Sequence, residues 1–230
     1  MKICVIGAGI IGSIWGKHYH EAGQLYALWN RTPKPELPCF HQDLIKASQN
    51  ADMLHIVLSE PQVVQKTLQT LQPILAEKKP LLVQSSTISP KWSEENELFV
   101  TSQGARYVEA PFTGSKTVAE KKGVVFFIGG PAQSKQEAIE ELKLISSHIF
   151  DLGSCTHASA IKLAMNLNIS GIGQALNESL SLARSFGIDD KMFFNVLSRN
   201  ASRSGVSDMK QEKLMSGDFS PHFSTKHMLK

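Results

Sequence analysis

Cysteine is scarce in this chain of 230 residues, which contains only Cys4, Cys39 and Cys155. The three are odd in number, far apart and in no metal-ligand pattern, so neither a disulfide framework nor a zinc site is indicated. Cys4 lies in an apolar, strand-like run, where a cysteine usually acts as a small buried hydrophobic residue. The histidines share no metal spacing either, and we expect no metal. A reducing cytoplasmic location is the simplest interpretation.

Long apolar runs and blocks of like charge are also missing. No apolar stretch approaches the roughly 20 residues that a membrane-spanning helix needs. The run after Lys2 resembles a signal peptide only superficially, because Gly7, Gly9 and Gly12 interrupt it and have another structural explanation. The 24 basic and 21 acidic side chains give a net charge of +3 and are scattered along the chain. We therefore expect a protein that binds neither membranes nor nucleic acid.

What the sequence does contain, up to about residue 151, is an alternation of strand-like and helical patterns. Strands are expected at 2–6, 25–29, 53–58, 81–84, 106–110 and 124–128, and helices at 10–22, 43–50, 62–76 and 91–102. Such alternation predicts an α/β domain, a doubly wound parallel sheet with helices on both faces.

The remainder of the chain shows helical patterns only. One long helix is expected at 158–186, with shorter ones at 190–198 and 207–214. We therefore divide the chain into an α/β domain at 1–152 and an all-helical substrate or dimerisation domain at 153–230, entered by the long interdomain helix. Small residues along that helix suit a homodimer or homotetramer.

A glycine motif follows the first expected strand and opens the first helix. Gly7 permits a tight turn, Gly9 lets the backbone approach a pyrophosphate, and Gly12 lets the helix pack on the strand. The helix N-terminus, with Ile10 and Ile11, favours the negative charge of phosphate. These five residues predict a Rossmann-type dinucleotide site, although glycines of this spacing also serve plain turns.

The end of the second strand distinguishes the two nicotinamide dinucleotides. NAD-binding chains place an acidic residue there for the ribose 2′-hydroxyl. This chain has Asn30, Arg31 and Thr32 instead, and Arg31 can pair with a 2′-phosphate. NADP is favoured over NAD, the alternative being that Arg31 is a solvated loop residue.

Three further segments carry a resemblance to a known family. They are EAPFTGSK at 109–116, GSCTHASAIKLAMN at 153–166 and FSTKHMLK at 223–230. The chain resembles the β-hydroxyacid dehydrogenases, which include 3-hydroxyisobutyrate dehydrogenase, tartronate semialdehyde reductase and glyoxylate/succinic semialdehyde reductase. The motifs occur in the family's order over nearly the whole chain, and the last branch is the most similar.

The resemblance implies that Lys162 and Asn166 are the catalytic pair. Their spacing of four places them on one helix face. Apolar neighbours would desolvate the lysine and lower its pKa towards a range where it exchanges a proton as general acid or base. A helix lysine that points to water is the plainer alternative.

Substrate binding is expected at Thr113, Gly114 and Ser115, which follow a strand at the carboxyl edge of the sheet. The family usually has a serine where Thr113 stands, and the extra methyl group would narrow the pocket. Phe223 is a further substrate-binding candidate.

Further cofactor contacts are expected at other strand ends. Leu58 and Ser59 are placed for the adenosine side, and the resemblance puts Thr87 near the nicotinamide and Lys230 beside the cofactor. The hydroxyl cluster at 85–87 has a plain alternative as loop or cap chemistry, with Ser89 as a helix cap.

The sequence stops at Lys230 within an apparent helix start, so we expect the helical domain to be incomplete there. The overall expectation is an NADP-dependent β-hydroxyacid dehydrogenase or short-chain semialdehyde reductase with glyoxylate or succinic semialdehyde as favoured substrate. The alternatives are 3-hydroxyisobutyrate dehydrogenase and a non-catalytic NADP-binding regulator or scaffold. Lys162 argues against an imine reductase.

Overall fold

A computed structural model describes residues 1–218 and 220. The predicted site residues Phe223 and Lys230 therefore lie outside the described residues. Two compact units are present, Met1–Leu163 and a second that begins at Ala164. The boundary predicted at residue 152 from the sequence pattern stays a prediction.

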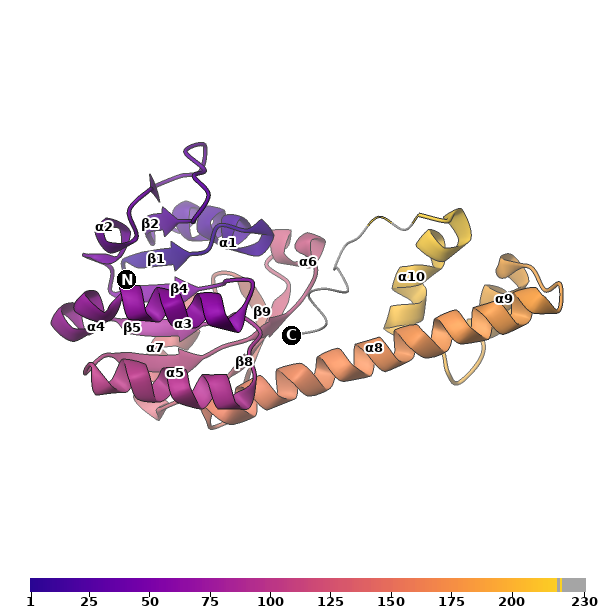
Figure 1. Ribbon diagram of the computed structural model, residues 1–230. Helices are drawn as coiled ribbons and strands as arrows, with labels where there is room; N and C mark the ends of the chain where they lie inside the picture. The colour runs from indigo at the N-terminus through magenta and orange to yellow at the C-terminus, as the bar shows by residue number, and fades with distance from the viewer. Residues whose placement is uncertain (219, 221–230) are drawn as a thin grey trace. The chain divides into compact units, whose positions relative to one another are not determined.

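The first unit is built on a six-stranded sheet in which all neighbouring strands run parallel (Figure 1). The strands lie in the order β3-β2-β1-β4-β5-β6. From β1 the chain first adds β2 and β3 on one side and then β4, β5 and β6 on the other, as in a doubly wound sheet. The predicted fold class is thereby confirmed. The strands are β1 (Ile3–Ile6), β2 (Leu25–Trp29), β3 (Phe40–His41), β4 (Met53–Ile56), β5 (Leu81–Gln84) and β6 (Arg106–Glu109).

Each face of this sheet carries its own hydrophobic core. In β1, Cys4 and Ile6 belong to one core, while Ile3 and Val5 belong to the other, because side chains alternate along a strand. The first core is shared with α2 (Leu44–Ser48), α3 (Pro61–Thr70), α4 (Gln72–Lys78) and α5 (Pro90–Ser102). The second is shared with α1 (Ile10–Glu21) and α7 (Ala132–Leu142).

A smaller sheet adds to the second core. It consists of β7 (Phe112–Thr113), β8 (Val124–Ile128) and β9 (Ser146–Asp151), with α6 (Lys116–Glu120) between the first two strands. β7 pairs antiparallel with β8, and β8 pairs parallel with β9. The strand expected at 124–128 thus forms, but outside the main sheet. The helix expected at 62–76 is divided, because Pro73 occupies the first turn of a new helix that starts after Leu71.

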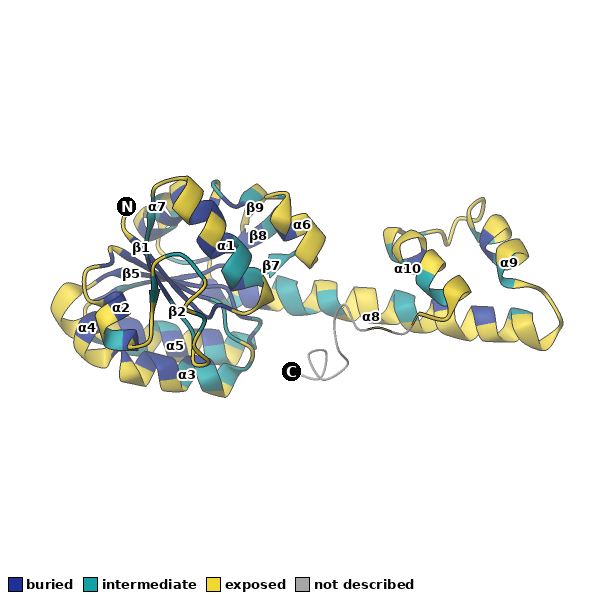
Figure 2. Cartoon of the chain, turned by 90° about the horizontal axis from the view of Figure 1, so that it is seen from above, coloured by how far each residue is buried: buried dark blue, intermediate teal, exposed yellow. Residues whose placement is uncertain are grey.

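The second unit contains helices in its described part. The helix α8 (Cys155–Ser185) begins within the first unit and is continuous over 31 residues, which confirms the predicted long helix. It is followed by α9 (Asp190–Leu197) and α10 (Gly205–Ser216). The buried hydrophobic residues in the described part of this unit are few, and Figure 2 shows the helices as mostly exposed. They are Leu176, Leu180 and Phe194.

Candidate functional site

The glycine turn between β1 and α1 is the most constrained backbone of the site. A Cβ atom on Gly12 would lie 1.9 Å from the carbonyl oxygen of Gly7, and one on Gly7 would lie 2.2 Å from that of Val57. Gly7 also has a φ of 110°, a conformation that favours glycine. These two residues are therefore required by the close packing of strand, turn and helix.

Gly9 differs from both, because its missing side chain faces open space. No atom lies within 4 Å of the position that a Cβ on Gly9 would occupy. Gly9 caps α1 without a side-chain hydrogen bond, and no acidic side chain lies in the first turn. The first backbone N–H groups of a helix have no partner within the helix and attract anions. This open, uncapped turn fits the pyrophosphate of a dinucleotide.

The loop after β2 presents its predicted cofactor residues to solvent. Asn30 donates from its side-chain amide to the carbonyl of Thr32 at 2.8 Å, which orders the turn around Arg31. Arg31 and Thr32 are exposed, and no carboxylate stands among residues 30–32. A guanidinium held on an ordered turn suits a phosphate ligand.

The loops after β4 and β5 are joined by a hydrogen bond that the sequence did not reveal. The backbone N–H of Leu58 donates to the Ser86 hydroxyl at 2.8 Å, while Ser59 is exposed and Thr87 half-buried. Ser89 caps α5 through the N–H of Trp92 at 3.3 Å, which confirms the capping alternative for this residue.

A buried carboxyl, Glu109, lies at the end of β6 and was missed as a functional candidate. Its side-chain oxygens accept hydrogen bonds from Gln84 Nε2 at 2.9 Å, and from the hydroxyls of Ser93 and Tyr107, each at 2.7 Å. Burial raises the pKa of Glu109 to about 8, although these hydrogen bonds lower it. Nothing in the local sequence distinguishes this glutamate from an exposed one.

The predicted substrate segment is a tight turn into α6. Thr113 pairs with Val125 in the smaller sheet and is half-buried. Gly114 has a φ of 144°, and its Cβ would lie 2.9 Å from a methyl group of Val124. The Ser115 hydroxyl accepts from the Val118 N–H at 3.4 Å and so caps α6. Ser115 has at least this structural role.

Lys162 lies in the third turn of α8 and is half-buried. Burial lowers the pKa of its ammonium group to about 8. Asn166 follows one turn later on the same helix and is also half-buried. A lysine of this pKa can exchange a proton near neutral pH, as general acid–base chemistry requires.

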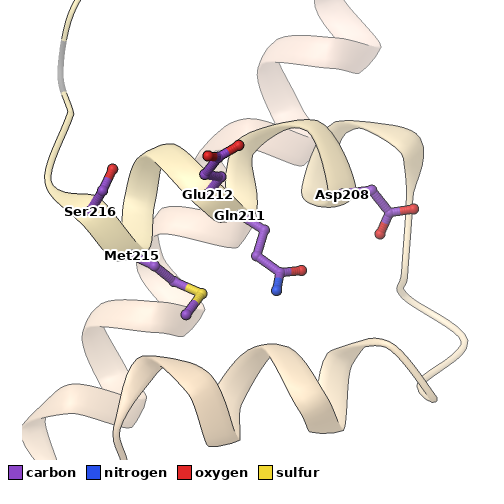
Figure 3. Close-up of a pocket in the computed structure, with 5 residues that line it drawn as sticks. All are labelled: Asp208, Gln211, Glu212, Met215 and Ser216. Atoms are coloured by element: carbon purple, nitrogen blue, oxygen red, sulfur yellow. The ribbon is translucent and has the colours of Figure 1, made fainter.

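Other features of the described residues add no competing site. Within residues 1–218 and 220, no three His, Cys, Asp or Glu side chains are grouped to hold a metal ion. None of the described helices is long and apolar enough to cross a membrane. A shallow hollow on α10 contains none of the predicted site residues (Figure 3). It is lined by Asp208, Gln211, Glu212, Met215 and Ser216.

A doubly wound parallel sheet with an open glycine turn at its first crossover is the architecture of a dinucleotide-binding domain. Residues 2–156 match the NAD binding domain of 6-phosphogluconate dehydrogenase. Residues 156–230 match the domain described as NAD-binding of NADP-dependent 3-hydroxyisobutyrate dehydrogenase. The chain belongs to the β-hydroxyacid dehydrogenase family, and is an NAD(P)-dependent oxidoreductase that acts on CH–OH groups.

Comparisons with individual proteins agree with this family assignment. An uncharacterized oxidoreductase of Synechocystis sp. is 28% identical, with 100% of this chain and 82% of that protein covered. Glyoxylate/succinic semialdehyde reductase 1 of Arabidopsis thaliana is 23% identical with the same coverage. Among solved structures, 3-hydroxyisobutyrate dehydrogenase of Mycobacterium tuberculosis with L-serine has a TM-score of 0.88 at 21% identity, and covers 99% of this chain and 82% of that one.

Proposed function

We propose that the protein is an NADP-dependent short-chain semialdehyde reductase in which Lys162 is the general acid and base. The observation that carries the proposal is the half-buried Lys162, whose pKa burial lowers to about 8. A solvated helix lysine would keep its ordinary pKa near 10.4 and would hold its proton throughout the neutral range.

When bound, NADPH supplies the hydride that reduces the substrate carbonyl carbon. Lys162 in its ammonium form donates a proton to the carbonyl oxygen, which leaves an alcohol and a neutral amine. In the oxidative direction the neutral amine takes the proton of the hydroxyl group. Asn166, one turn further along α8, is assigned to hold the substrate oxygen or carboxylate in line.

Cofactor binding is assigned to the glycine turn, the loop after β2 and the two joined strand-end loops. Gly7 and Gly12 hold the turn in shape, and Gly9 with the helix start at Ile10 and Ile11 receives the pyrophosphate. Arg31 pairs with the 2′-phosphate, and Asn30 and Thr32 support it, which favours NADP over NAD. Leu58, Ser59 and Thr87 complete the assignment among the described residues.

For the substrate we favour glyoxylate or succinic semialdehyde. Both carry a carboxylate, which the Thr113 hydroxyl and the backbone N–H groups of Gly114 and Ser115 suit. The Arabidopsis relative is named for these two substrates, although it is only 23% identical. The alternative is 3-hydroxyisobutyrate, favoured by the name of the Mycobacterium structure, whose bound L-serine is likewise a small 3-hydroxy acid.

The deciding experiment follows NADPH consumption with glyoxylate, succinic semialdehyde and tartronate semialdehyde, using wild-type protein and Lys162→Ala. We expect turnover that is lost in the variant, with NADPH binding retained in both. Oxidation of 3-hydroxyisobutyrate without any semialdehyde turnover would establish the alternative substrate. Binding of NADPH without turnover on any of them would instead indicate a regulator or scaffold.

Self-association completes the proposal. Large apolar side chains on α8 and directly after it are exposed, with Leu167 at 75% and Leu182 at 63% on the helix and Phe186 at 79% just beyond its end. Apolar area of this kind is stabilised by a second subunit, and a homodimer or homotetramer is our expectation. Light scattering after gel filtration measures the oligomeric state directly.

A cytoplasmic location is part of the same proposal, since all three cysteines are free thiols.

A further inference from the structure

The substrate segment is held to α1 at two points, one on each side of its turn. Before the turn, the ring of Phe112 in β7 meets the buried ring of Trp15 edge-on, with 4.8 Å between the ring centroids. After the turn, the buried His18 side chain donates from Nε2 to the Ala119 carbonyl oxygen of α6 at 3.1 Å. A carbonyl oxygen can only accept, so Nε2 carries the proton. Trp15 and His18 are three positions apart and therefore share one face of α1.

The rest of the segment has few anchors. β7 pairs with β8 over only two residues. The helix α6 has five residues, of which Ala119 is buried and the others are exposed. A helix of this length has no stability of its own and depends on its tertiary contacts. The placement of α6 therefore depends on the contact between Ala119 and α1.

Packing transmits the position of α6 to the substrate turn. The Ser115 hydroxyl accepts from the Val118 N–H at 3.4 Å, and the Ser115 carbonyl accepts from the Ala119 N–H at 2.9 Å. A Cβ on Gly114 would lie 3.2 Å from a methyl group of Val118 and 2.9 Å from one of Val124. The turn is thus enclosed between α6 and β8. A displacement of α6 would move the N–H groups of Gly114 and Ser115 that are assigned to the substrate carboxylate.

The helix that carries both anchors is the one assigned to the cofactor at its other end. Gly9 caps α1, which begins at Ile10. His18 lies about 12 Å further along the axis than Ile10, at a rise of about 1.5 Å per residue. One helix therefore sets the separation between the assigned pyrophosphate site and the assigned substrate turn. The bond from His18 to Ala119 joins residues 101 positions apart, so no local pattern in the sequence indicates it.

We propose that His18 is a positioning residue: its hydrogen bond to Ala119 fixes the substrate turn on the helix that receives the cofactor. The other ring nitrogen, Nδ1, makes no hydrogen bond in the described structure and lies 3.5 Å from the Glu21 carboxylate of the same helix. The role therefore belongs to Nε2. Trp15 supports the same placement by packing, since its indole N–H has no hydrogen-bond partner among the described residues. This inference rests on the proposed function, in which the substrate turn is assigned.

The test compares His18→Gln with His18→Met, two side chains of nearly equal size. The glutamine amide nitrogen takes the place of Nε2 and keeps the donor, whereas methionine has no donor. Reduction of glyoxylate and of succinic semialdehyde is followed at saturating NADPH, and the dissociation constant of NADPH is measured by fluorescence titration. The same comparison uses oxidation of 3-hydroxyisobutyrate if that is the substrate.

We expect kcat/KM to fall by about tenfold or more in His18→Met, because a small misplacement of bound substrate lowers the rate steeply. In His18→Gln, kcat/KM should stay within about threefold of wild type, because the donor to Ala119 is retained. The dissociation constant of NADPH should change by less than about twofold in both, because distant sites respond independently. A residue that only stabilised the fold would not separate substrate turnover from cofactor binding in this way.

His20→Met is the matched control, because His20 lies on the same helix but is exposed. It should behave like wild type. An unchanged kcat/KM in His18→Met, or equal losses in His18→Met and His18→Gln, would overturn the inference. A parallel loss of NADPH affinity would also overturn it, because α1 as a whole would then be distorted. If His18→Met does not fold, His18→Asn takes its place, since its amide lies at the position of Nδ1 and does not reach Ala119.

A second measurement needs neither cofactor nor substrate. The N–H groups of Ala119 and Gly123 donate to the carbonyls of Ser115 and Val118 at 2.9 and 2.8 Å, within α6 and the turn after it. Their hydrogen exchange should be about tenfold faster in His18→Met and unchanged in His18→Gln. Equal exchange in wild type and His18→Met would overturn the inference. If wild type turns over none of the substrates, the proposed function fails, while the exchange data still decide whether His18 holds the turn.

Discussion

At the scale of single residues, the proposed chemistry depends on how far burial shifts the pKa of Lys162. An ammonium group loses hydration energy when it is buried, and each unit of pKa change corresponds to about 1.4 kcal/mol between its two protonation states. The half-buried position on α8 thus gives one side chain two accessible states near neutral pH. In the proposed reaction, reduction consumes the protonated amine and oxidation consumes the neutral amine. The pH therefore decides which direction is favoured.

We predict opposite pH dependences for the two directions. Reduction requires the protonated amine, so its rate should fall above about pH 8, where the pKa of Lys162 lies. Oxidation requires the neutral amine, so its rate should rise through the same range and level off above it. Initial rates between pH 6 and 10 measure both.

Variants of Lys162 provide the controls. Lys162→Ala should lower kcat by about two to four orders of magnitude in both directions. Lys162→Arg should keep the positive charge but lose the titration, because an arginine side chain does not release its proton in this range. Identical profiles in wild type and Lys162→Arg would contradict the assignment.

We predict that cofactor choice also depends on a single residue, Arg31. Arg31→Ala should weaken NADPH binding by about tenfold to a hundredfold, the usual effect of losing a charge-assisted hydrogen bond to phosphate. NADH binding should hardly change, because NADH has no 2′-phosphate. Lys34→Ala, in the same loop, is the matched control for general charge. If Arg31→Ala weakened both cofactors equally, Arg31 would have a role other than phosphate recognition.

At the scale of elements, we expect two glycines of the turn between β1 and α1 to differ in role: Gly12 is needed for stability and Gly9 for cofactor binding. Gly12→Ala places a methyl group where the Gly7 carbonyl stands, and should destabilise the fold by about 1–3 kcal/mol or more. Gly9→Ala meets no atom, so it should cost at most about 1 kcal/mol, yet fill the space assigned to the pyrophosphate. Chemical denaturation and NADPH titration of the two variants distinguish these effects. Lost stability in Gly9→Ala with intact binding would refute the distinction.

The elements also show which features the sequence could predict. The strands β1, β4 and β5 are short, mostly apolar runs and α8 has a long helical pattern, and all four were predicted. Short elements such as β3 and β7 have two residues each, too few for a periodic signal. The strand β9 is largely exposed and contains two serines and a histidine, so it lacks the apolar pattern that marks a strand.

The candidate site was predictable only where chemistry depends on neighbours in the sequence. The glycine turn is a local pattern, and Lys162 and Asn166 were assigned through a family resemblance carried by the local segment at 153–166; both assignments stay predictions. The hydrogen bond from Gln84 to Glu109 depends on strand register, which pairs Gln84 with Glu109. No local sequence pattern specifies which residues of two separate strands are paired.

At the scale of the whole molecule, the buried side chains of His55 and Glu109 change the folding stability in opposite directions as the pH changes. Burial lowers the pKa of His55 to about 3, so the folded chain keeps this histidine neutral. Its ring nitrogens hydrogen-bond Tyr19 and Ser85 at 3.1 and 2.9 Å. Because the unfolded chain takes up a proton near pH 6.5, the contribution of His55 to stability is lost as pH falls from about 6.5 towards 3. Glu109 has a raised pKa, and its contribution is lost as pH rises from about 4.5 towards 8.

Between about pH 4.5 and 6.5 these two slopes have opposite signs, each of about 1.4 kcal/mol per pH unit. We predict that stability falls with rising pH in His55→Gln and rises with pH in Glu109→Gln, with wild type between them. Urea unfolding followed by tryptophan emission measures this, since Trp15, Trp29 and Trp92 all lie in the first unit. Parallel slopes in the two variants would contradict the assignment of both groups.

The two units should also differ in resistance to proteolysis. The second unit has three buried hydrophobic residues in its described part, whereas each face of the main sheet covers a far larger core. Small cores give marginal stability. Trypsin should therefore cut first at Arg199 or Arg203, which are exposed between α9 and α10, and leave the first unit uncut. Mass spectrometry of the early fragments identifies the site, and initial cleavage within the sheet would contradict the prediction.

The glycine turn has a genetic consequence. Every single-base change of a glycine codon that alters the residue produces either a stop or an amino acid with a Cβ atom. At Gly7 and Gly12 that atom collides with a backbone carbonyl, so no neighbouring allele leaves the fold unstrained. At Gly9 the same change meets empty space. In a saturation library, alleles at positions 7 and 12 should be depleted in a screen for protein abundance. Alleles at position 9 should pass that screen and fail only in one that selects for catalysis.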